Sequence, residues 1–185
     1  MDPREAERLI AAAVPAEPGV WADFGAGDGA FTRALAARLG PGARVYAVDR
    51  DERALAVLRR DGVRASVEVI GTRADLEQAV QLPGLAPATL DGFVLANTLH
   101  FLSDPPAALA RLAAFLRPDG MAVLIEYDGR RPSRWVPHPI VSADLPRLFS
   151  AAALGPPRVV ARTASAFGGE MYVAAGRKLP NALRS

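Results

Sequence analysis

The sequence contains no cysteine, few aromatic residues and a single lysine among its 22 basic residues. Without cysteine the chain has no disulfide, no thiol nucleophile and no cysteine-based zinc site. It also lacks an apolar run of the ~20 residues that a membrane-spanning helix needs, and its first residues do not form a signal-peptide pattern. We therefore expect a cytoplasmic protein with no membrane partner.

The charge of the chain is nearly balanced, with a formal net charge of +2. This value is too small to indicate a nucleic-acid-binding protein, and the chain has no aromatic-basic stripe and no motif for flipped bases. Residues 111–185 carry 11 basic but only 5 acidic residues, a net charge of +6, and there Arg130, Arg131 and Arg134 either favour an anionic substrate or form a solvated loop. We adopt the solvated loop as the simpler interpretation.

The length of 185 residues suits one domain with a full core. We expect a single domain over residues 1–185, with an N-terminal helix within residues 1–18, as a monomer or a homodimer. There are no repeats and no low-complexity segments.

The most informative segment is a short apolar strand, residues 20–24, that runs into a glycine turn and then into a helix at residues 30–39. The turn reads Asp23-x-Gly25-x-Gly27-x-Gly29. Glycines at such a turn let backbone amides approach a ligand that side chains would keep away. The helix start adds unpaired N–H groups at the same place. The segment predicts a cofactor-binding loop.

A second acid, Asp49, closes the apolar and β-branched run 43–49, which predicts a buried parallel strand. An acid at this position, about 20 residues beyond the glycines, can accept hydrogen bonds from both hydroxyls of a ribose. The alternative role of Asp49 is an N-cap for the helix that follows from Arg50.

Strands alternate with helices along the rest of the chain, which predicts a parallel sheet with right-handed crossovers. The last two strands are too close for a helical crossover and should form an antiparallel hairpin. The fold class is therefore α/β, a doubly wound, seven-stranded, mostly parallel sheet with a C-terminal antiparallel hairpin. The expected helices are 5–14, 51–60, 74–80, 105–116 and 142–154, and the further strands are 64–70, 90–97, 121–127, 158–163 and 170–176.

These features together resemble the class I S-adenosylmethionine-dependent methyltransferases over nearly the whole chain. Besides the glycine motif and Asp49, Leu90-Asp91-Gly92-Phe93-Val94 resembles the fourth-strand motif of that family. Phe115-Leu116-Arg117-Pro118-Asp119-Gly120 resembles the turn before its fifth strand. The resemblance implies a Rossmann-like methyltransferase fold, S-adenosylmethionine as cofactor, and transfer of a methyl group by direct displacement to a small-molecule acceptor.

The resemblance also assigns cofactor-binding roles to residues of this chain. The glycine loop should wrap the methionine part, Asp23 should neutralise its amino group through water, and Asn97 should face the sulfonium. Relatives often carry an acid just after the third strand for the adenine amino group, and here Gly71-Thr72-Arg73 stands instead. Thr72 with the backbone, Asp75 further on, or apolar packing remain as alternatives. The implied cofactor residues are Asp23, Gly25, Ala26, Gly27, Gly29, Asp49, Arg50, Thr72, Arg73 and Asn97.

Catalytic and substrate residues are expected after the fourth and fifth strands. His100 is a candidate general base if a hydroxyl is methylated; its other interpretation is a histidine that packs or orients substrate. Residues 129–141 predict a substrate lid, in which Trp135 and His138, together with Tyr127 before it, either contact the acceptor or pin the loop to the core. Asn97, Glu126 and Asp128 are not spaced for a metal, so we expect none.

Two other functions need to be weighed. Gly25-Ala26-Gly27-Asp28-Gly29-Ala30 also satisfies a dinucleotide-binding pattern, but Asp23 and Asp28 would repel a pyrophosphate, and the chain is short for an NAD enzyme. A non-catalytic S-adenosylmethionine-binding regulator, or a partner subunit that has lost its chemistry, is the second alternative.

Overall fold

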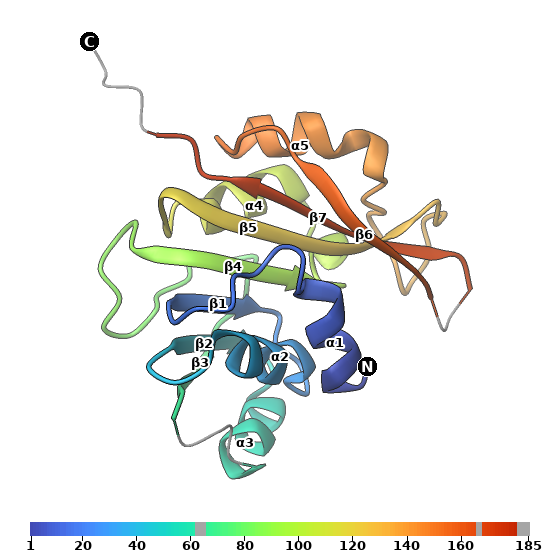
Figure 1. Ribbon diagram of the computed structural model, residues 1–185. Helices are drawn as coiled ribbons and strands as arrows, with labels where there is room; N and C mark the ends of the chain where they lie inside the picture. The colour runs from blue at the N-terminus through green and yellow to red at the C-terminus, as the bar shows by residue number, and fades with distance from the viewer. Residues whose placement is uncertain (62–65, 166–167, 181–185) are drawn as a thin grey trace.

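The computed structural model describes residues 1–61, 66–165 and 168–180, and seven strands form one sheet in the order β3-β2-β1-β4-β5-β7-β6 (Figure 1). Strands β1 to β5 pair in parallel, whereas β7 is antiparallel to both β5 and β6. This confirms the predicted mostly parallel sheet with a C-terminal antiparallel hairpin. The strands are β1 (Val20–Phe24), β2 (Arg44–Asp49), β3 (Glu68–Arg73), β4 (Leu90–Ala96), β5 (Leu116–Asp128), β6 (Arg158–Ala164) and β7 (Glu170–Arg177).

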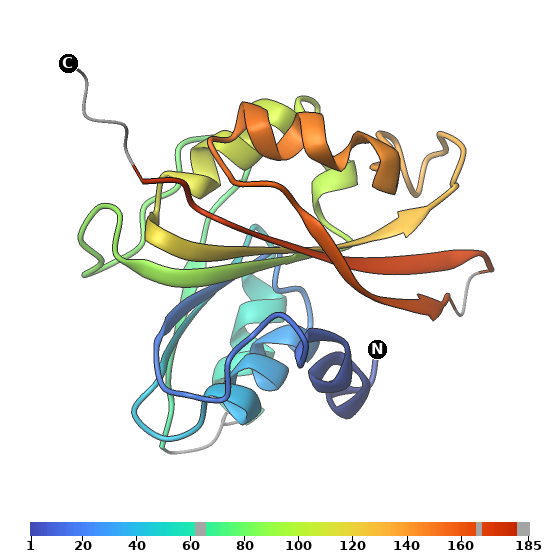
Figure 2. The same ribbon diagram turned by 45° about the horizontal axis from the view of Figure 1, so that its top comes forward.

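Helices cover both faces of the sheet, as a doubly wound fold requires. Figures 1 and 2 show α1, α2 and α3 on one face and α4 and α5 on the other. The helices are α1 (Pro3–Ile10), α2 (Ala30–Leu39), α3 (Glu52–Asp61), α4 (Pro105–Ala113) and α5 (Leu145–Ala151).

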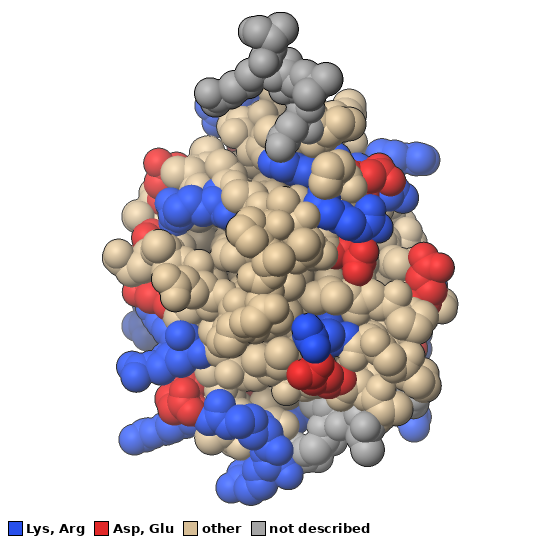
Figure 3. Space-filling model, turned by 90° about the vertical axis from the view of Figure 1, so that its left-hand side faces the viewer, with Lys and Arg blue, Asp and Glu red and all other residues tan. Residues whose placement is uncertain are grey.

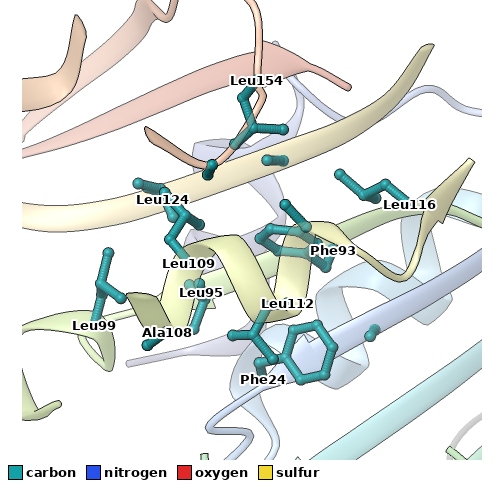
Figure 4. Packing of buried hydrophobic residues seen from close by; sticks show 14 of the residues in the cluster. Phe24, Phe93, Leu95, Leu99, Ala108, Leu109, Leu112, Leu116, Leu124 and Leu154 are labelled. Atoms are coloured by element: carbon teal, nitrogen blue, oxygen red, sulfur yellow. The ribbon is translucent and has the colours of Figure 1, made fainter. Parts of the chain in front are cut away.

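Each face has its own apolar core, because successive side chains of a buried strand point to opposite faces. On the α4 and α5 face, Phe24 and Phe93 meet edge to face with ring centroids 5.5 Å apart. Figure 4 shows these rings and Leu95 packed beneath Leu109 and Leu112 of α4. On the other face, buried residues of α1 and α2, such as Ile10 and Leu35, pack on the sheet residues Trp21 and Val45.

The strand order reverses between β1 and β4, where the chain winds away in opposite directions. Ligands of open α/β sheets bind in the crevice outside the carboxyl ends of the strands at such a point. Gly25 follows β1, Asp49 ends β2 and Asn97 follows β4. The topology therefore brings three predicted cofactor residues to one crevice.

The region after α3 departs from the expectation. Strand β3 ends at Arg73 rather than at residue 70, and the predicted strand start at residue 64 lies outside the described residues. The predicted helix 74–80 is wrong: the chain makes a turn in which Gln78 N–H donates to Asp75 O at 2.9 Å. The Asp75 carboxylate accepts the Glu77 N–H at 3.0 Å, a local bond that competes with helix formation.

Several further boundaries differ from the prediction, since α1 is Pro3–Ile10 rather than 5–14 and α4 ends at Ala113 rather than at residue 116. Pro118-Asp119-Gly120 does turn, but as a bulge within β5, where the register with β4 jumps from Leu90↔Leu116 to Gly92↔Met121. The helix expected at 142–154 divides into a short 3₁₀ helix, Ser142–Asp144, and α5.

The edge where the parallel strands begin is lined by ion pairs. Arg44 pairs with Glu68 at 2.6 Å, and Arg117 pairs with Asp91 at 2.7 Å. Arg177, at the end of the antiparallel strand β7, pairs with Asp119 at 3.0 Å. Figure 3 views this side of the molecule and shows basic side chains with acidic ones among them around an uncharged centre.

Candidate functional site

The glycine loop after β1 packs closely against β2 and against Thr98, which follows β4. Gly25 and Ala26 donate their N–H groups to Val48 O at 2.8 and 2.9 Å. Gly25 has φ +82°, and a Cβ there would overlap the Thr98 side chain. Gly27 has φ +51°, and a Cβ there would meet no atom within 4 Å. The first glycine therefore allows close packing, and the second faces open space that a ligand can occupy.

Asp49 lies beside this loop and binds two backbone amides. Its Oδ2 accepts Gly27 N–H at 2.8 Å and its Oδ1 accepts Asp51 N–H at 2.8 Å. The N-cap of α3 is Asp51, whose side chain accepts Arg53 N–H at 2.9 Å and whose carbonyl accepts Leu55 N–H at 3.2 Å. The alternative role predicted for Asp49 thus belongs to Asp51. Each Asp49 oxygen keeps a lone pair for a further donor.

A cavity of about 290 Å³ opens at the crevice. Of the ten residues expected to hold the cofactor, Gly25, Asp49, Arg50 and Asn97 are among its walls, and the other six are not: Asp23, Ala26, Gly27, Gly29, Thr72 and Arg73. With β3 ending at Arg73, the acid that comes just after the third strand is Asp75, which lines the cavity. The predicted strand ends at residue 70, so Asp75 lies further along than the position directly after that strand. The cavity is lined by Gly25, Asp49, Arg50, Ala74, Asp75, Leu76, Glu77, Asn97, Thr98, Phe101 and Leu102.

Asp23 lies beneath the glycine loop rather than in the cavity wall. Its side chain is 1% exposed, and Oδ2 accepts the Thr32 hydroxyl at 2.7 Å. Desolvation raises the pKa of Asp23 to about 7; the Thr32 hydrogen bonds oppose this, and the nearby Asp49 and Asp28 carboxylates add to it. Among the described residues Asp23 forms no ion pair. It is a buried acid that supports the loop from below.

Asn97 has an uncommon backbone and an unsatisfied side chain. Its φ is +49°, its N–H donates to Ile125 O at 2.8 Å, and its Nδ2 lies 3.9 Å from Met171 Sδ. Within the described part of the chain its buried Oδ1 has no hydrogen-bond partner, and the same holds for the Thr72 hydroxyl oxygen. A buried acceptor without a donor is costly, so Oδ1 is suited to a donor from a ligand.

A second cavity, of about 460 Å³, adjoins the first, because Asn97 and Phe101 line both. Its other walls are His100, Tyr127, Arg130, Trp135 and Val136. The Arg130 guanidinium lies 4.8 Å from the Tyr127 ring centroid, and Arg130 Nη2 donates to Gly168 O at 2.7 Å. Trp135 is 68% exposed at the rim.

His138 is not brought to this second cavity. It lines a separate hollow of about 540 Å³ with prolines and α5. Its backbone N–H donates to His100 O at 3.0 Å. The structure thus unites Tyr127 and Trp135 of the three predicted substrate residues and leaves His138 in a different environment.

His100 is paired with a glutamate in the core. Both side chains are 1% exposed, and His100 Nδ1 lies 2.5 Å from Glu126 Oε2. Glu126 Oε1 accepts the His100 backbone N–H at 3.3 Å. The sequence indicates Glu126 only as a candidate metal ligand and does not predict this pairing. A signal was present, because Glu126 is a charged residue directly after the buried apolar run 122–125 of β5.

The remaining metal candidate, Asp128, has a structural role. It accepts hydrogen bonds from Ser142 Oγ at 2.6 Å and from Arg162 Nη1 at 2.9 Å. Desolvation raises its pKa, but these hydrogen bonds outweigh that effect and lower the pKa of Asp128 to about 2. No group of three or more His, Asp or Glu side chains in the described ranges is arranged to hold a metal ion. Over the same residues no helix is long and apolar enough to cross a membrane.

The fold and the glycine-lined crevice define an α/β protein that binds a nucleoside cofactor at the switch point of its sheet. A family model described as a methyltransferase domain matches residues 22–124, more than half of the chain. The chain belongs to this family, the class I S-adenosylmethionine-dependent methyltransferases.

Solved structures support the same assignment. The 1,6-didemethyltoxoflavin-N1-methyltransferase of Burkholderia thailandensis is 26% identical, with a TM-score of 0.73 over 96% of this chain and 78% of that chain. That enzyme was solved with bound 1,6-didemethyltoxoflavin and S-adenosylhomocysteine. The YcgJ protein of Bacillus subtilis shares the fold at 15% identity, with a TM-score of 0.70 over 96% of this chain and 100% of that one.

A curated relative is a longer protein. The biotin biosynthesis bifunctional protein BioCD of Bordetella avium is 34% identical over 122 residues, which are 62% of this chain and 23% of that protein. The chain therefore spans less than a quarter of that relative.

The residues of the crevice fit S-adenosylmethionine, the cofactor of the family. The cofactor offers donors, namely an ammonium, two ribose hydroxyls and an adenine amino group. The cavity offers acceptors, namely the carboxylates of Asp49 and Asp75 and the unpartnered Oδ1 of Asn97. The open space over Gly27 leaves room beside the loop. Family membership thus decides between S-adenosylmethionine and NAD in favour of the former.

Proposed function

We propose that this protein transfers a methyl group from S-adenosylmethionine to a small-molecule acceptor. The observation that carries the proposal is that two cavities, of about 290 and 460 Å³, share Asn97 and Phe101 as common walls. One cavity is rich in acceptor oxygens and the other in aromatic surface. A cofactor in the first and an acceptor in the second would meet at the shared wall.

In the first cavity, three polar side chains hold the cofactor. Asp49 binds the ribose hydroxyls, Asp75 accepts the adenine amino group, and Arg50 lies against the adenine. Gly25, Ala26 and Gly27 surround the methionine part, with Asp23 supporting the loop. When bound, S-adenosylmethionine supplies a methyl group on a positively charged sulfur, and its transfer leaves the carbon–sulfur electron pair on the sulfur. The protein contributes alignment and the exclusion of water.

In the second cavity, residues 129–141 act as the lid. The lid is fixed to the core at two points, where His138 N–H donates to His100 O at 3.0 Å and Tyr172 OH donates to Ile140 O at 2.8 Å. Between β5 and these anchors, Trp135 projects at the rim with Arg134 stacked 4.4 Å from its ring centroid. Tyr127, Phe101 and Trp135 present aromatic surface, which favours a planar, apolar acceptor. His138 serves as an anchor of the lid rather than as a substrate contact.

His100 is the proposed catalytic residue of this cavity. Its ring lies with its centroid 4.3 Å from that of Phe101 and 5.9 Å from that of Tyr127. The Burkholderia relative is named for methylating a small molecule and was solved with one bound, which supports an acceptor of this kind here.

Isothermal titration with S-adenosylhomocysteine and with NAD tests the cofactor. Tight binding of NAD and none of S-adenosylhomocysteine would refute the proposal. A metabolite screen, read as release of S-adenosylhomocysteine from S-adenosylmethionine, then tests catalysis. Cofactor binding with no turnover of any acceptor would favour the non-catalytic regulator instead. The open, aromatic second cavity supports an enzyme, because a regulator without chemistry has no need of it.

A further inference from the structure

Glu126 uses both of its carboxylate oxygens on a single residue. Oε1 accepts the backbone N–H of His100 at 3.3 Å, and Oε2 lies 2.5 Å from His100 Nδ1. Both side chains are 1% exposed, so water does not compete for these bonds. Among the described residues, the other charged or titratable groups near the pair are Tyr127 at the end of β5 and Arg130 in the lid, which line the cavity, and Tyr172 of β7, which lies opposite Glu126 in the sheet.

This arrangement determines where the ring carries its proton. A backbone N–H can only donate, so Oε1 has to be an acceptor. An ionised carboxylate has no proton to donate, so a ring nitrogen facing Oε2 has to be the donor. Nδ1 then bears the proton of the neutral ring, and Nε2 bears the lone pair. Among the described residues no hydrogen bond engages Nε2, and His100 lines the acceptor cavity together with the neighbouring rings of Phe101 and Tyr127.

We propose that Glu126 is a positioning residue that fixes His100 in the Nδ1–H tautomer, so that Nε2 removes a proton from a phenolic, enolic or heteroaromatic N–H acceptor. The inference rests on the proposed function and names its substrate class. Nε2 takes the acceptor proton while the freed lone pair on oxygen or nitrogen forms the bond to the methyl carbon, and the carbon–sulfur pair stays on sulfur. Glu126 stabilises the resulting imidazolium until it releases the proton to water.

Replacing Glu126 with glutamine tests the tautomer because glutamine has the same shape. The amide oxygen has to accept the fixed His100 backbone N–H, so the amide NH₂ faces Nδ1. Nδ1 becomes an acceptor, and the ring proton moves to Nε2, which can no longer act as a base. Nitrogen-15 NMR of the imidazole distinguishes the two tautomers, and the chain has only 2 histidines, so a His138→Gln variant assigns both.

We expect the Nδ1–H tautomer in the wild-type protein and the Nε2–H tautomer in Glu126→Gln. With an acceptor found by the screen, Glu126→Gln should lower kcat by at least ~10²-fold and change KM by less than about threefold. The matched control is Asp128→Asn, the same loss of charge on the same strand without contact with His100; it should leave the tautomer unchanged.

A wild-type ring that carries its proton on Nε2, or on both nitrogens at about pH 8, would overturn the inference. So would an Nδ1–H tautomer that persists in Glu126→Gln. If Glu126→Gln does not fold, the wild-type spectrum alone decides. None of these readings requires the cofactor, so failure of the protein to bind S-adenosylhomocysteine would count against the proposed function separately.

Discussion

At the edge where the parallel strands begin, charged side chains are matched with one another; at the edge where they end, Asp128 is paired with Arg162, but among the described residues a buried acid has no cation and a buried amide oxygen has no donor. The first edge holds the pairs Arg44–Glu68, Arg117–Asp91 and Arg177–Asp119. The second edge holds the unpartnered Asn97 Oδ1, the buried acid Asp23 and two adjoining cavities.

This difference between the two edges shows that the strand-ending edge lowers the stability of the fold. Exposed ion pairs contribute little, but they leave nothing unsatisfied. A buried carboxylate without a cation and a buried amide oxygen without a donor both cost free energy. Local violations of this kind are expected at functional sites, because a ligand supplies the missing partner. The largest effects of mutation on activity should therefore come from the strand-ending edge.

The largest expected effect comes from His100→Gln, which retains a donor toward Glu126 but has no imidazole to take a proton. We expect kcat to fall by ~10²–10⁴-fold with the affinity for S-adenosylhomocysteine unchanged, because the base acts only in the chemical step. Steady-state kinetics with the screened acceptor and titration calorimetry measure the two quantities. Retention of most of kcat with a raised KM would show that His100 only orients the substrate.

A second effect of this edge is a pH dependence of stability. The pKa of Asp23 in the folded protein, about 7, lies above its usual 3.8, so the folded state holds this proton more tightly than the unfolded state does. The resulting stability is fully present below about pH 4 and is lost as the pH rises through about 7, by ~2–4 kcal/mol. Denaturant unfolding at several pH values measures it.

Asp23→Asn is the control, since an amide cannot ionise and still accepts the Thr32 hydroxyl. Its free energy of unfolding should lack this decline between about pH 4 and 8. Parallel pH curves for the variant and the wild-type protein would show that Asp23 ionises normally. Asp128, whose pKa is lowered to about 2, should show the opposite sign, with stability lost only as the pH falls through that value.

A third effect concerns cofactor affinity. Asp49→Ala removes charge-assisted hydrogen bonds to the ribose and should weaken binding of S-adenosylhomocysteine by ~1.5–3 kcal/mol in titration calorimetry. The matched control is Asp51→Ala, two residues further on, which removes the N-cap of α3 and leaves the cavity wall intact. It should cost ~1 kcal/mol of stability and leave the affinity unchanged. Equal losses of affinity in both variants would mean that Asp49 acts only by holding the loop.

Much of the fold was predictable because its signals are local. The buried strands β1 and β2 and the glycine turn are continuous patterns, and the short gap before β7 required a hairpin. The helix predicted at 74–80 was wrong. The composition of this segment suits a helix, but the Asp75 side chain accepts the Glu77 N–H and the chain forms a turn. Because of that error, the sequence did not predict that Asp75 lines the cofactor cavity.

The site residues that belong to one continuous motif could be predicted from the sequence. Those that come together from segments far apart in the chain could not. Gly25 and Asp49 belong to motifs that can be recognised along the chain. The pairing of His100 with Glu126 joins residues 26 positions apart, and only the sheet register and the turn after β4 bring them together. His138 illustrates the converse, because its place in the lid suggested a substrate contact, yet its position in the fold faces another hollow.

The smallest expected effect comes from the strand-starting edge, through Arg117→Ala. Arg117 Nε donates to Asp91 Oδ1 at 2.7 Å, and the two side chains are 48% and 32% exposed. Asp91 keeps its other bond, in which Oδ2 accepts Val20 N–H at 2.7 Å, so no buried group loses its partner. The free energy of unfolding should fall by less than ~1 kcal/mol, and less still at high salt, where exposed pairs are screened. The affinity for S-adenosylhomocysteine should not change, since this edge lies at the opposite ends of the strands. A fall in affinity comparable with that of Asp49→Ala would break the contrast between the two edges, because it would show that the ion pairs hold the site in shape.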